Sequence, residues 1–495
     1  MENQKKQARP DPIIVHLGDM GRYQFFCLIL LYLTRFPIGF IMMSHLFLAA
    51  KSEYYCVQPS NADPCSKECE TVDFNRSIFS ETIEMTFDLF CDRFWLSSLS
   101  QFAVMGGIMI GAIIFGVLSD RYGRWKLLLI ECALQFTFGV AVPFSIHYIM
   151  YILLRLLTAI ATGGQMTTSF VLMMEIIGPN ARVTMANLSH IPFCLSIAIL
   201  TLLAYFLRDW RYFHLSLFPF CAVFLLYICL IYESPRWLFT TGRLEKAIHV
   251  TEIIAKKNGR PNESIILIRS QMEEAYKNRP IDSAKEQGNL LDLFRTPNIC
   301  KNTIIMAMEW LNACTVFYGS TQYISRLNDD VFLNVFISGV ISAPGCIISI
   351  FIVKYLGRRN SIIITNFVSA LSFLLLPCMT DITPTVVVVF AVVGLVGVTV
   401  TFPSLYIYAS EIFPTVVRTT GMGICSCFGR IGSMIAPFIT SDLARISPII
   451  PPLVYGSIAA LGFILAFFLP ETKNQSVVET IADGEALGKK NKAVQ

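Results

Sequence analysis

The feature that most constrains the fold of this chain is a series of long apolar runs separated by short polar turns. Residues 95–117 and 127–146 are two such runs, each long enough to cross a hydrocarbon core that needs about 20 helical residues. The turn between them, Gly116–Lys126, has three basic residues and is short enough to require an antiparallel hairpin. Because Lys and Arg collect in cytoplasmic loops, this turn is predicted to lie in the cytoplasm and to orient the whole chain.

The same criterion predicts twelve membrane-crossing helices. They cover residues 22–50, 95–117, 127–146, 148–177, 184–206, 212–232, 302–325, 331–355, 361–380, 384–408, 419–440 and 448–469. With 54% hydrophobic and 15% charged residues, the chain of 495 residues is too apolar to be a set of soluble domains. We therefore expect an all-α polytopic membrane protein with two six-helix halves. Its net charge of +4 gives no indication of a nucleic-acid partner.

The predicted domains follow from these spans. An N-terminal segment, 1–21, and a C-terminal tail, 470–495, are both expected in the cytoplasm. The polar part of the tail, Asn474–Gln495, is expected to be disordered. The six-helix bundles cover 22–232 and 302–469, and the segment 233–301 between them is predicted to be a cytoplasmic helical linker.

The polar segment 51–94 follows the first span and is therefore predicted to be extracellular. It contains four cysteines, Cys56, Cys65, Cys69 and Cys91, which in an oxidising compartment predict two disulfides. Four cysteines allow three pairings, and their spacing favours none of them. Asn75 begins an Asn-Arg-Ser glycosylation acceptor in the same segment.

The two halves repeat short motifs at a nearly constant spacing. The segment 175–182, which begins with Glu and ends with Arg, matches 411–418 after 236 positions. Two further pairs recur after 234 and 238 positions: Gly123 with Gly357, and Glu233 with Glu471. A parallel repeat of six spans is typical of a transporter whose halves rock about a site near the middle of the membrane.

Several motifs together resemble known transporters. The turn Gly116–Lys126, Arg155 with Gly163 and Gly164, and the segments 233–238 and 470–473 resemble the major facilitator superfamily, whose sugar porters share these signatures. The long first loop that ends in Phe87–Asp92, the leader that ends in Gly21–Gln24 and the triplet Phe317–Gly319 are similar to the organic cation/anion/carnitine transporter family. This resemblance implies polyspecific carriage of small organic ions across the plasma membrane by alternating access.

Charged residues at the cytoplasmic helix ends form the predicted gate. They are Asp120, Arg121, Arg124, Glu175, Arg182, Glu233 and Arg236 in the first half, and Arg358, Arg359, Glu411, Arg418 and Glu471 in the second. Opposite charges there can pair across the halves when the protein is open to the outside, and separate when it opens inward. The alternative is that they only anchor helix ends and set the topology. An exposed pair contributes only about 0–1 kcal/mol, which suits a latch that must open.

Arg430, midway along the eleventh span, is the principal candidate for substrate binding. A charge inside a span costs about 2.5–3.5 kcal/mol on insertion scales, and here it would attract a carboxylate or sulfate. In the family that the chain resembles, cation-selective members carry an acid at this position and anion or carnitine carriers carry arginine. The family's acid in the eighth span corresponds to Ser342, and the lysine of many anion carriers corresponds to Cys346. A zwitterion or monoanion therefore fits best; alternatively, Arg430 pairs with a buried acid.

Other polar and aromatic residues complete the predicted site: Gln165, Asn312, Phe317, Tyr318 and Tyr406. The aromatic side chains could hold an ammonium group by cation–π contact, or could simply pack between helices. Arg35 and Arg155 either line the cavity or pair with Glu131 or Glu309.

Enzyme classes find no support in the sequence. It has no Gly-rich phosphate loop ending in Gly-Lys-Ser/Thr and no metal-binding His or Cys spacing, so neither an enzyme activity nor a cofactor is expected. The expected partners are a small organic ion and the lipid bilayer, with a coupling ion or counter-substrate compatible with the same sequence. The competing functions are an organic cation carrier, a sugar or other neutral-solute porter, and a non-transporting receptor.

Overall fold

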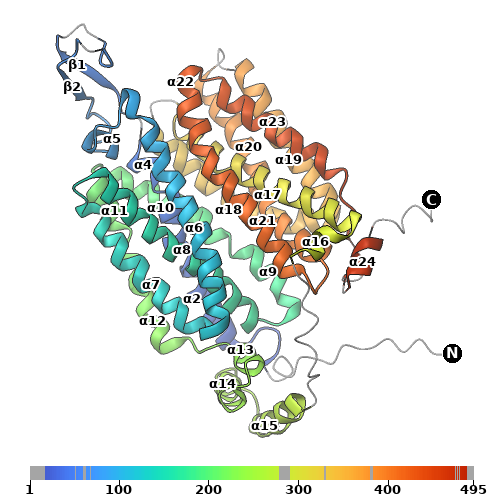
Figure 1. The fold of residues 1–495 in the computed structure, drawn as a ribbon. Coiled ribbons are helices and arrows are strands. Elements are labelled where there is room, and N and C mark those ends of the chain that lie inside the picture. The colour runs from blue at the N-terminus through green and yellow to red at the C-terminus, as the bar shows by residue number, and fades with distance from the viewer. Residues whose placement is uncertain are drawn as a thin grey trace.

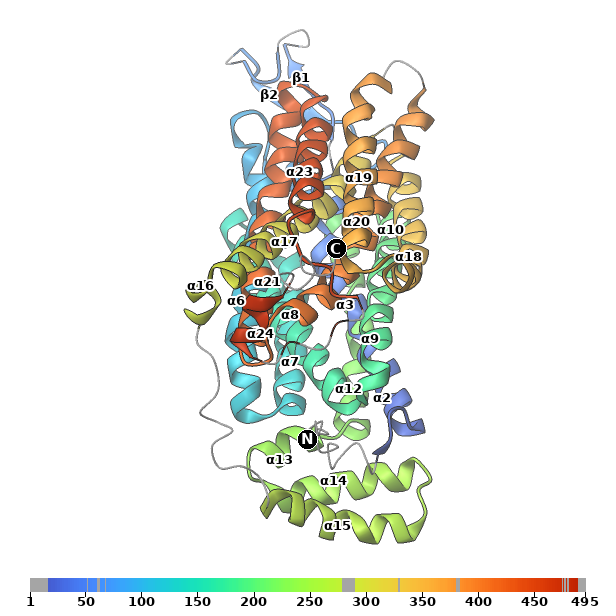
Figure 2. The same ribbon diagram turned by 90° about the vertical axis from the view of Figure 1, so that its right-hand side faces the viewer.

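The structure is a computed structural model that describes residues 17–50, 52–59, 63–66, 68–277, 290–327, 330–379, 383–473, 475, 478 and 480–487. Its helices form two halves that lie side by side along their length, coloured blue to green and yellow to red in Figure 1. Each half contains the helices expected for six spans. Strands β1 (Tyr54–Gln58) and β2 (Thr71–Phe74) lie at one end of the helices, and α13 (Pro235–Thr240), α14 (Leu244–Lys257) and α15 (Asn262–Lys277) lie at the other (Figure 2).

The first half contains six spans, of which three are interrupted. They comprise α2 (Arg22–Leu33), α3 (Arg35–Met43) and α4 (His45–Leu48); α6 (Trp95–Tyr122); α7 (Arg124–Ala141); α8 (Tyr148–Ile176); α9 (Pro179–Leu188) and α10 (Ile191–Phe206); and α11 (Trp210–Ser216) with α12 (Val223–Leu230). The first span changes from α2 to α3 at Thr34. Pro37 in the first turn of α3 lacks the N–H that would bond to the preceding turn.

The second half has longer, mostly continuous helices. They are α17 (Pro297–Ile324), α18 (Val331–Leu356), α19 (Arg358–Leu375), α20 (Pro384–Ile412), α21 (Arg418–Phe438), continued by one π-helical turn and α22 (Ala444–Ile446), and α23 (Ile450–Ala466). Helix α17 begins at Pro297, so residues 297–301 belong to the second bundle and not to the linker as predicted.

Nine helical segments in the described part of the chain are long and apolar enough to cross a membrane. The other three predicted spans correspond to α11 with α12, to α17 and to α23. The span made of α11 and α12 is broken at its middle, and α23 has only 17 residues. Helix α17 is long but has buried polar side chains, among them Asn302, Glu309 and Asn312, which lower its hydropathy. It lies inside the bundle, where protein surrounds such groups.

The segment after the first span forms a small disulfide-bonded hairpin. Strands β1 (Tyr54–Gln58) and β2 (Thr71–Phe74) pair antiparallel. Cys56 pairs with Cys69, and Cys65 pairs with Cys91, which confirms the two predicted disulfides and selects one of the three pairings. Asn75 lies beside the hairpin, at a cavity of about 510 Å³ that is also lined by Glu53 and Arg326. We call this end of the molecule the disulfide end.

The opposite end carries the turn at Gly123 and the linker helices, and we call it the basic end. The helices are α13 (Pro235–Thr240), α14 (Leu244–Lys257), α15 (Asn262–Lys277) and α16 (Asp292–Arg295). Ser234 caps α13 by accepting from the N–H of Trp237 at 3.2 Å. The side chain of Asn258, just after α14, accepts from the N–H of Tyr23 at 2.9 Å, which attaches the linker to the first span.

The C-terminal tail differs from its prediction as a disordered segment. Residues Ile481–Ala486 form α24, which begins with a capping box between Thr480 and Asp483. The N–H of Asn298 donates to the carboxylate of Glu485 at 2.8 Å, and its side chain donates to the carbonyl of Leu487 at 2.9 Å. The tail is ordered here because it supplies these acceptors and buries Leu487 at the start of α17.

Candidate functional site

At the basic end of the first half, Arg124 is the centre of a charge cluster. Its guanidinium lies 2.8 Å from the carboxylate of Asp120 and 3.0 Å from that of Glu175. The carboxylate of Glu233 accepts from the N–H groups of Arg124 and Trp125 at 2.9 and 3.1 Å. Burial raises the pKa of Glu233, and these N–H groups oppose the rise. The cluster holds the start of α7 against the ends of α8 and α12.

The second half repeats this arrangement at the equivalent positions. Arg358 donates to Glu411 at 2.6 Å, and Glu471 accepts from the N–H groups of Arg358 and Arg359 at 3.1 and 3.2 Å. The glycines that precede the two arginines, Gly123 and Gly357, both have positive φ, of 110° and 88°. The predicted internal repeat is therefore present in the contacts as well as in the sequence.

A further pair of predicted gate residues follows the same repeat. Arg182 donates to the carbonyl of Ile177 at 3.2 Å, and Arg418 donates to the carbonyl of Phe413 at 3.3 Å. Each of the contacts described for the two clusters and for these arginines lies within one half. In this conformation they brace helix ends, as the alternative interpretation holds, and pairing across the halves stays a prediction for the outward-open state.

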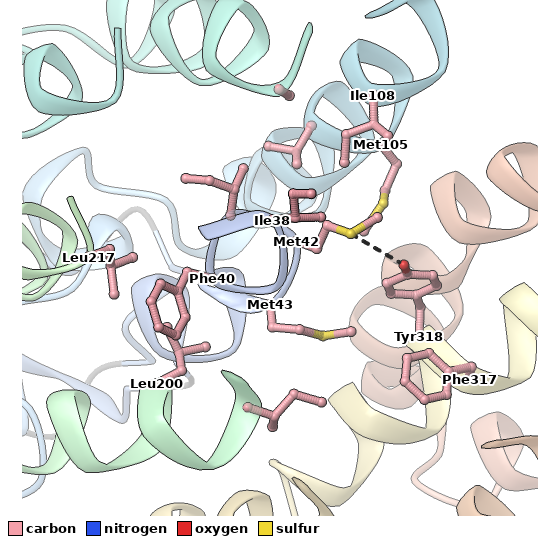
Figure 3. Packing of buried hydrophobic residues seen from close by; sticks show 14 of the residues in the cluster. Ile38, Phe40, Met42, Met43, Met105, Ile108, Leu200, Leu217, Phe317 and Tyr318 are labelled. Carbon is pink, nitrogen blue, oxygen red and sulfur yellow. Dashed lines mark hydrogen bonds between the residues drawn. The ribbon is translucent and has the colours of Figure 1, made fainter. Parts of the chain in front are cut away.

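At the disulfide end the two halves meet through methionine and aromatic side chains. The hydroxyl of Tyr318 donates to the sulfur of Met42 at 3.7 Å. Figure 3 shows Met42, Met43 and Met105 of the first half facing Phe317 and Tyr318 of the second.

Two further contacts close the same end of the molecule. The rings of Phe47 and Phe332 stack at 5.8 Å. Ser98 donates to the carboxylate of Asp442 at 2.7 Å. The halves are thus closed against each other at the disulfide end.

Arg430 lies between the halves, next to Tyr318. It is buried, and its guanidinium donates to the sulfur of Met166, which is on α8 of the first half, at 3.1 Å. Its ionisable neighbours are Tyr318, Cys314 and Tyr406 of its own half. Within the described part of the chain, no Asp or Glu forms an ion pair with Arg430. A thioether is a weak acceptor and Tyr318 is the other hydrogen-bonding neighbour, so the remaining guanidinium N–H groups are available for a ligand.

Tyr406 is the centre of an aromatic cluster beside Arg430. Its ring lies 4.4 Å from that of Trp310, 5.6 Å from Phe402 and 5.8 Å from His190. Across the interface it faces Phe170 on α8 at 6.3 Å. Such a wall can hold the apolar part of an organic ligand, and its ring faces can also attract a cationic group.

Comparisons with known proteins agree with this architecture. The sequence profile of the sugar (and other) transporter family matches residues 39–482. An organic cation transporter-like protein of Drosophila melanogaster is 30% identical, over 98% of this chain and 94% of its own length. Solute carrier family 22 member 3 of Rattus norvegicus is 32% identical, over 86% of this chain and 75% of its own length. The organic cation/carnitine transporter 2 of Homo sapiens is 28% identical, over 95% of this chain and 93% of its own length.

The chain belongs to the organic cation/anion/carnitine transporter family. Among solved structures, the inward-open xylose transporter XylE of E. coli superposes with a TM-score of 0.68 at 17% identity, over 94% of this chain and 99% of its own. XylE bound to a bromodeoxyglucose has a TM-score of 0.66 at 18% identity, over 92% of this chain and 98% of its own. These likenesses show the major facilitator fold. The family match and the apolar helices of the described residues show a multi-pass membrane protein.

Two predicted substrate contacts of the transporter have partners within their own half in this conformation. Gln165 is fully buried and donates to the sulfur of Cys132 on α7, within its own half. Asn312 packs against Gly462 of α23. The sequence interpretation assigned these residues to the site from their position on central spans, but their helices turn them toward neighbours in the same half.

The two predicted contacts on α18 also have other neighbours. Ser342 donates to the carbonyl of Ser338, one turn earlier in α18. Cys346 lies 3.7 Å from the sulfur of Cys194 on α10, at a contact between the halves. Both side chains therefore contribute to helix packing in this conformation.

The pairs considered for the other buried charges are wrong. Glu131 accepts from Thr168 at 2.7 Å, and Glu309 accepts from Asn366 at 2.9 Å. Arg155 donates to the hydroxyl of Tyr151 at 2.9 Å. Both acids thus have neutral partners inside their own halves, and neither forms an ion pair with an arginine in the part of the chain that the structure describes.

Sequence reasoning missed Trp310, Phe402, Phe170 and Met166 of the transporter. The internal repeat could have found one of them, because the predicted Tyr406 follows Phe170 by the same 236 positions that relate the Glu and Arg motifs. In the described residues, no group of three His, Cys, Asp or Glu side chains could hold a metal ion.

Proposed function

We propose that this transporter carries small organic anions or zwitterions across the plasma membrane by alternating access, with the acidic group of the substrate bound to Arg430. The observation that supports this is a buried guanidinium at the interface of the halves that has no acidic partner among the described residues. Leaving such a charge uncompensated in a membrane is costly, and a carboxylate or sulfate would offset the cost. The proposal also places the disulfide end outside the cell and both termini in the cytoplasm.

The alternative is an organic cation carrier. The names of the Drosophila organic cation transporter-like protein and of the human organic cation/carnitine transporter 2 favour it. The aromatic cluster around Tyr406 could also accommodate an ammonium group. The positive field of Arg430 opposes it, because a monovalent cation would enter the low-dielectric site beside an uncompensated charge. A zwitterion could use both features, with its acid on Arg430 and its ammonium over the rings.

Uptake by Arg430 variants tests the proposal. We expect the wild-type transporter to take up an aryl carboxylate and carnitine but not tetraethylammonium. Arg430→Ala should lower both uptakes by more than about tenfold, because truncating one member of a buried charge pair costs about 2–5 kcal/mol. Arg430→Lys should retain part of the activity. Cell-surface biotinylation controls for expression, and aryl carboxylate uptake that is unchanged in Arg430→Ala would contradict the proposal.

A further inference from the structure

Arg35 is the first residue of α3, within the first membrane span, and its guanidinium has few polar partners for a position inside a span. It lies 13 residues inside the span that begins at Arg22, or about 20 Å along the helix. Its guanidinium carbon lies 5.9 Å from the ring centre of Phe170. With the other described residues its side chain forms neither a hydrogen bond nor an ion pair, although it has five N–H donors. The residue as a whole is only half-buried.

The surroundings of Arg35 connect it to Arg430. Phe170, which it contacts, faces Tyr406 at 6.3 Å across the interface. Tyr406 interacts electrostatically with both Arg35 and Arg430. His190 interacts with Arg35, and the His190 ring lies 5.8 Å from the Tyr406 ring. One cation from each half therefore flanks a single pair of aromatic rings.

This arrangement constrains the charge of the ligand. Two guanidinium groups of the same sign repel each other in a low-dielectric interior, and no described carboxylate forms an ion pair with either. A ligand with one acidic group would compensate one arginine and leave the other exposed to an apolar wall. A ligand with two separated acidic groups would compensate both.

We infer that Arg35 is a second anion-binding residue, and that it and Arg430 each bind one acidic group of an organic dianion whose hydrocarbon core lies against Phe170 and Tyr406. This inference rests on the proposed role of Arg430. It supplies the second cation that the sequence interpretation found missing at Cys346, from a different helix and from the other half. Because the two arginines belong to different halves, such a substrate would bridge the halves when bound.

The test compares two probes that differ by one acidic group. Hydrocinnamate has one carboxylate on a flexible arm, and para-carboxyhydrocinnamate adds a second at the far end of the ring. We expect the wild-type transporter to have a KM for the diacid about tenfold lower than for the monoacid, as one charge-assisted contact implies. Arg35→Gln should remove this preference by raising the diacid KM while changing the monoacid KM less than about twofold. Arg35→Lys should preserve it.

Three outcomes separate this inference from the proposed function. Equal KM values of the wild-type protein for the two probes would overturn the inference without the use of any variant. If Arg35→Gln changes the KM values of both probes equally, or changes neither, the inference is also overturned. A purely structural role of Arg35 would affect the two KM values alike. If hydrocinnamate uptake is also unchanged in Arg430→Ala, the proposed function fails as well; if that uptake is lost, the function stands while the second site is rejected.

Discussion

Gly163 lies where α8 crosses α6 with the two backbones in contact. A Cβ at Gly163 would lie 2.1 Å from the carbonyl oxygen of Ile108, and a Cβ at Gly111 would lie 1.9 Å from that of Ile160. The obstacle is main chain in both cases, so a side-chain rearrangement cannot relieve it. Small residues at such crossings allow membrane helices to pack closely, since lipid offers no hydrophobic drive for association.

We predict that Gly163→Ala destabilises the transporter by about 1–3 kcal/mol, the usual cost of overpacking. The measurement is the thermal unfolding midpoint of the purified protein in detergent, which should fall. Gly423→Ala, on α21, is the matched control because a Cβ there meets nothing within 4 Å. Equal midpoints for the two variants would show that the α6–α8 crossing can widen at little cost.

At the scale of elements, the pairing of α10 with α18 joins the two halves in the middle of the molecule. Gly339 of α18 packs against the backbone of Ala198 on α10, where a Cβ would lie 2.9 Å from the backbone nitrogen. In the same helix pair the sulfurs of Cys194 and Cys346 are 3.7 Å apart. Alternating access requires the halves to rotate against each other, so this contact must slide or re-form in each cycle.

A disulfide between Cys194 and Cys346 should therefore arrest transport. It would hold their Cα atoms about 4.4–6.8 Å apart and prevent the helices from sliding. We expect oxidation with copper phenanthroline to abolish uptake, and dithiothreitol to restore it. Cys194→Ser should keep its uptake under the same oxidant. The cross-link is identified by peptide mass spectrometry; full uptake by the cross-linked protein would mean that this helix pair moves as one body.

At the scale of the whole molecule, contacts at the disulfide end set which side of the transporter is closed. Ser98 at the start of α6 donates to Asp442 in the π-helical turn that follows α21. Arg445 donates to the carbonyl of Cys91 at 3.1 Å, and its guanidinium lies 4.8 Å from the ring centre of Phe94. These contacts connect the disulfide-bonded hairpin and the first half to the end of the eleventh span.

Asp442→Ala should shift the transporter toward the outward-open state, because Ser98 then loses its partner across the halves. The state that is closed at the disulfide end loses one charge-assisted hydrogen bond, which contributes about 1.5–3 kcal/mol to its stability. In a Met42→Cys background, an impermeant thiol reagent added outside the cell should label position 42 several-fold faster. Asp330→Ala provides the control, since Asp330 caps α18 at the same end by accepting from Leu333. Unchanged labelling would show that the apolar contacts alone keep this end closed.

The sequence by itself determined the apolar spans, the repeat and the presence of two disulfides in the segment 51–94, and it singled out Arg430 as a candidate for substrate binding. These follow from local physics: an apolar run of about 20 residues is a membrane helix wherever it occurs, and a charge inside it requires a reason. Only the tertiary structure decided the disulfide pairing, the order in the tail and the set of side chains that meet Arg430. An apolar helix has no polar face to set its rotation, so the directions of Gln165, Asn312 and Arg35 depend on packing against distant segments.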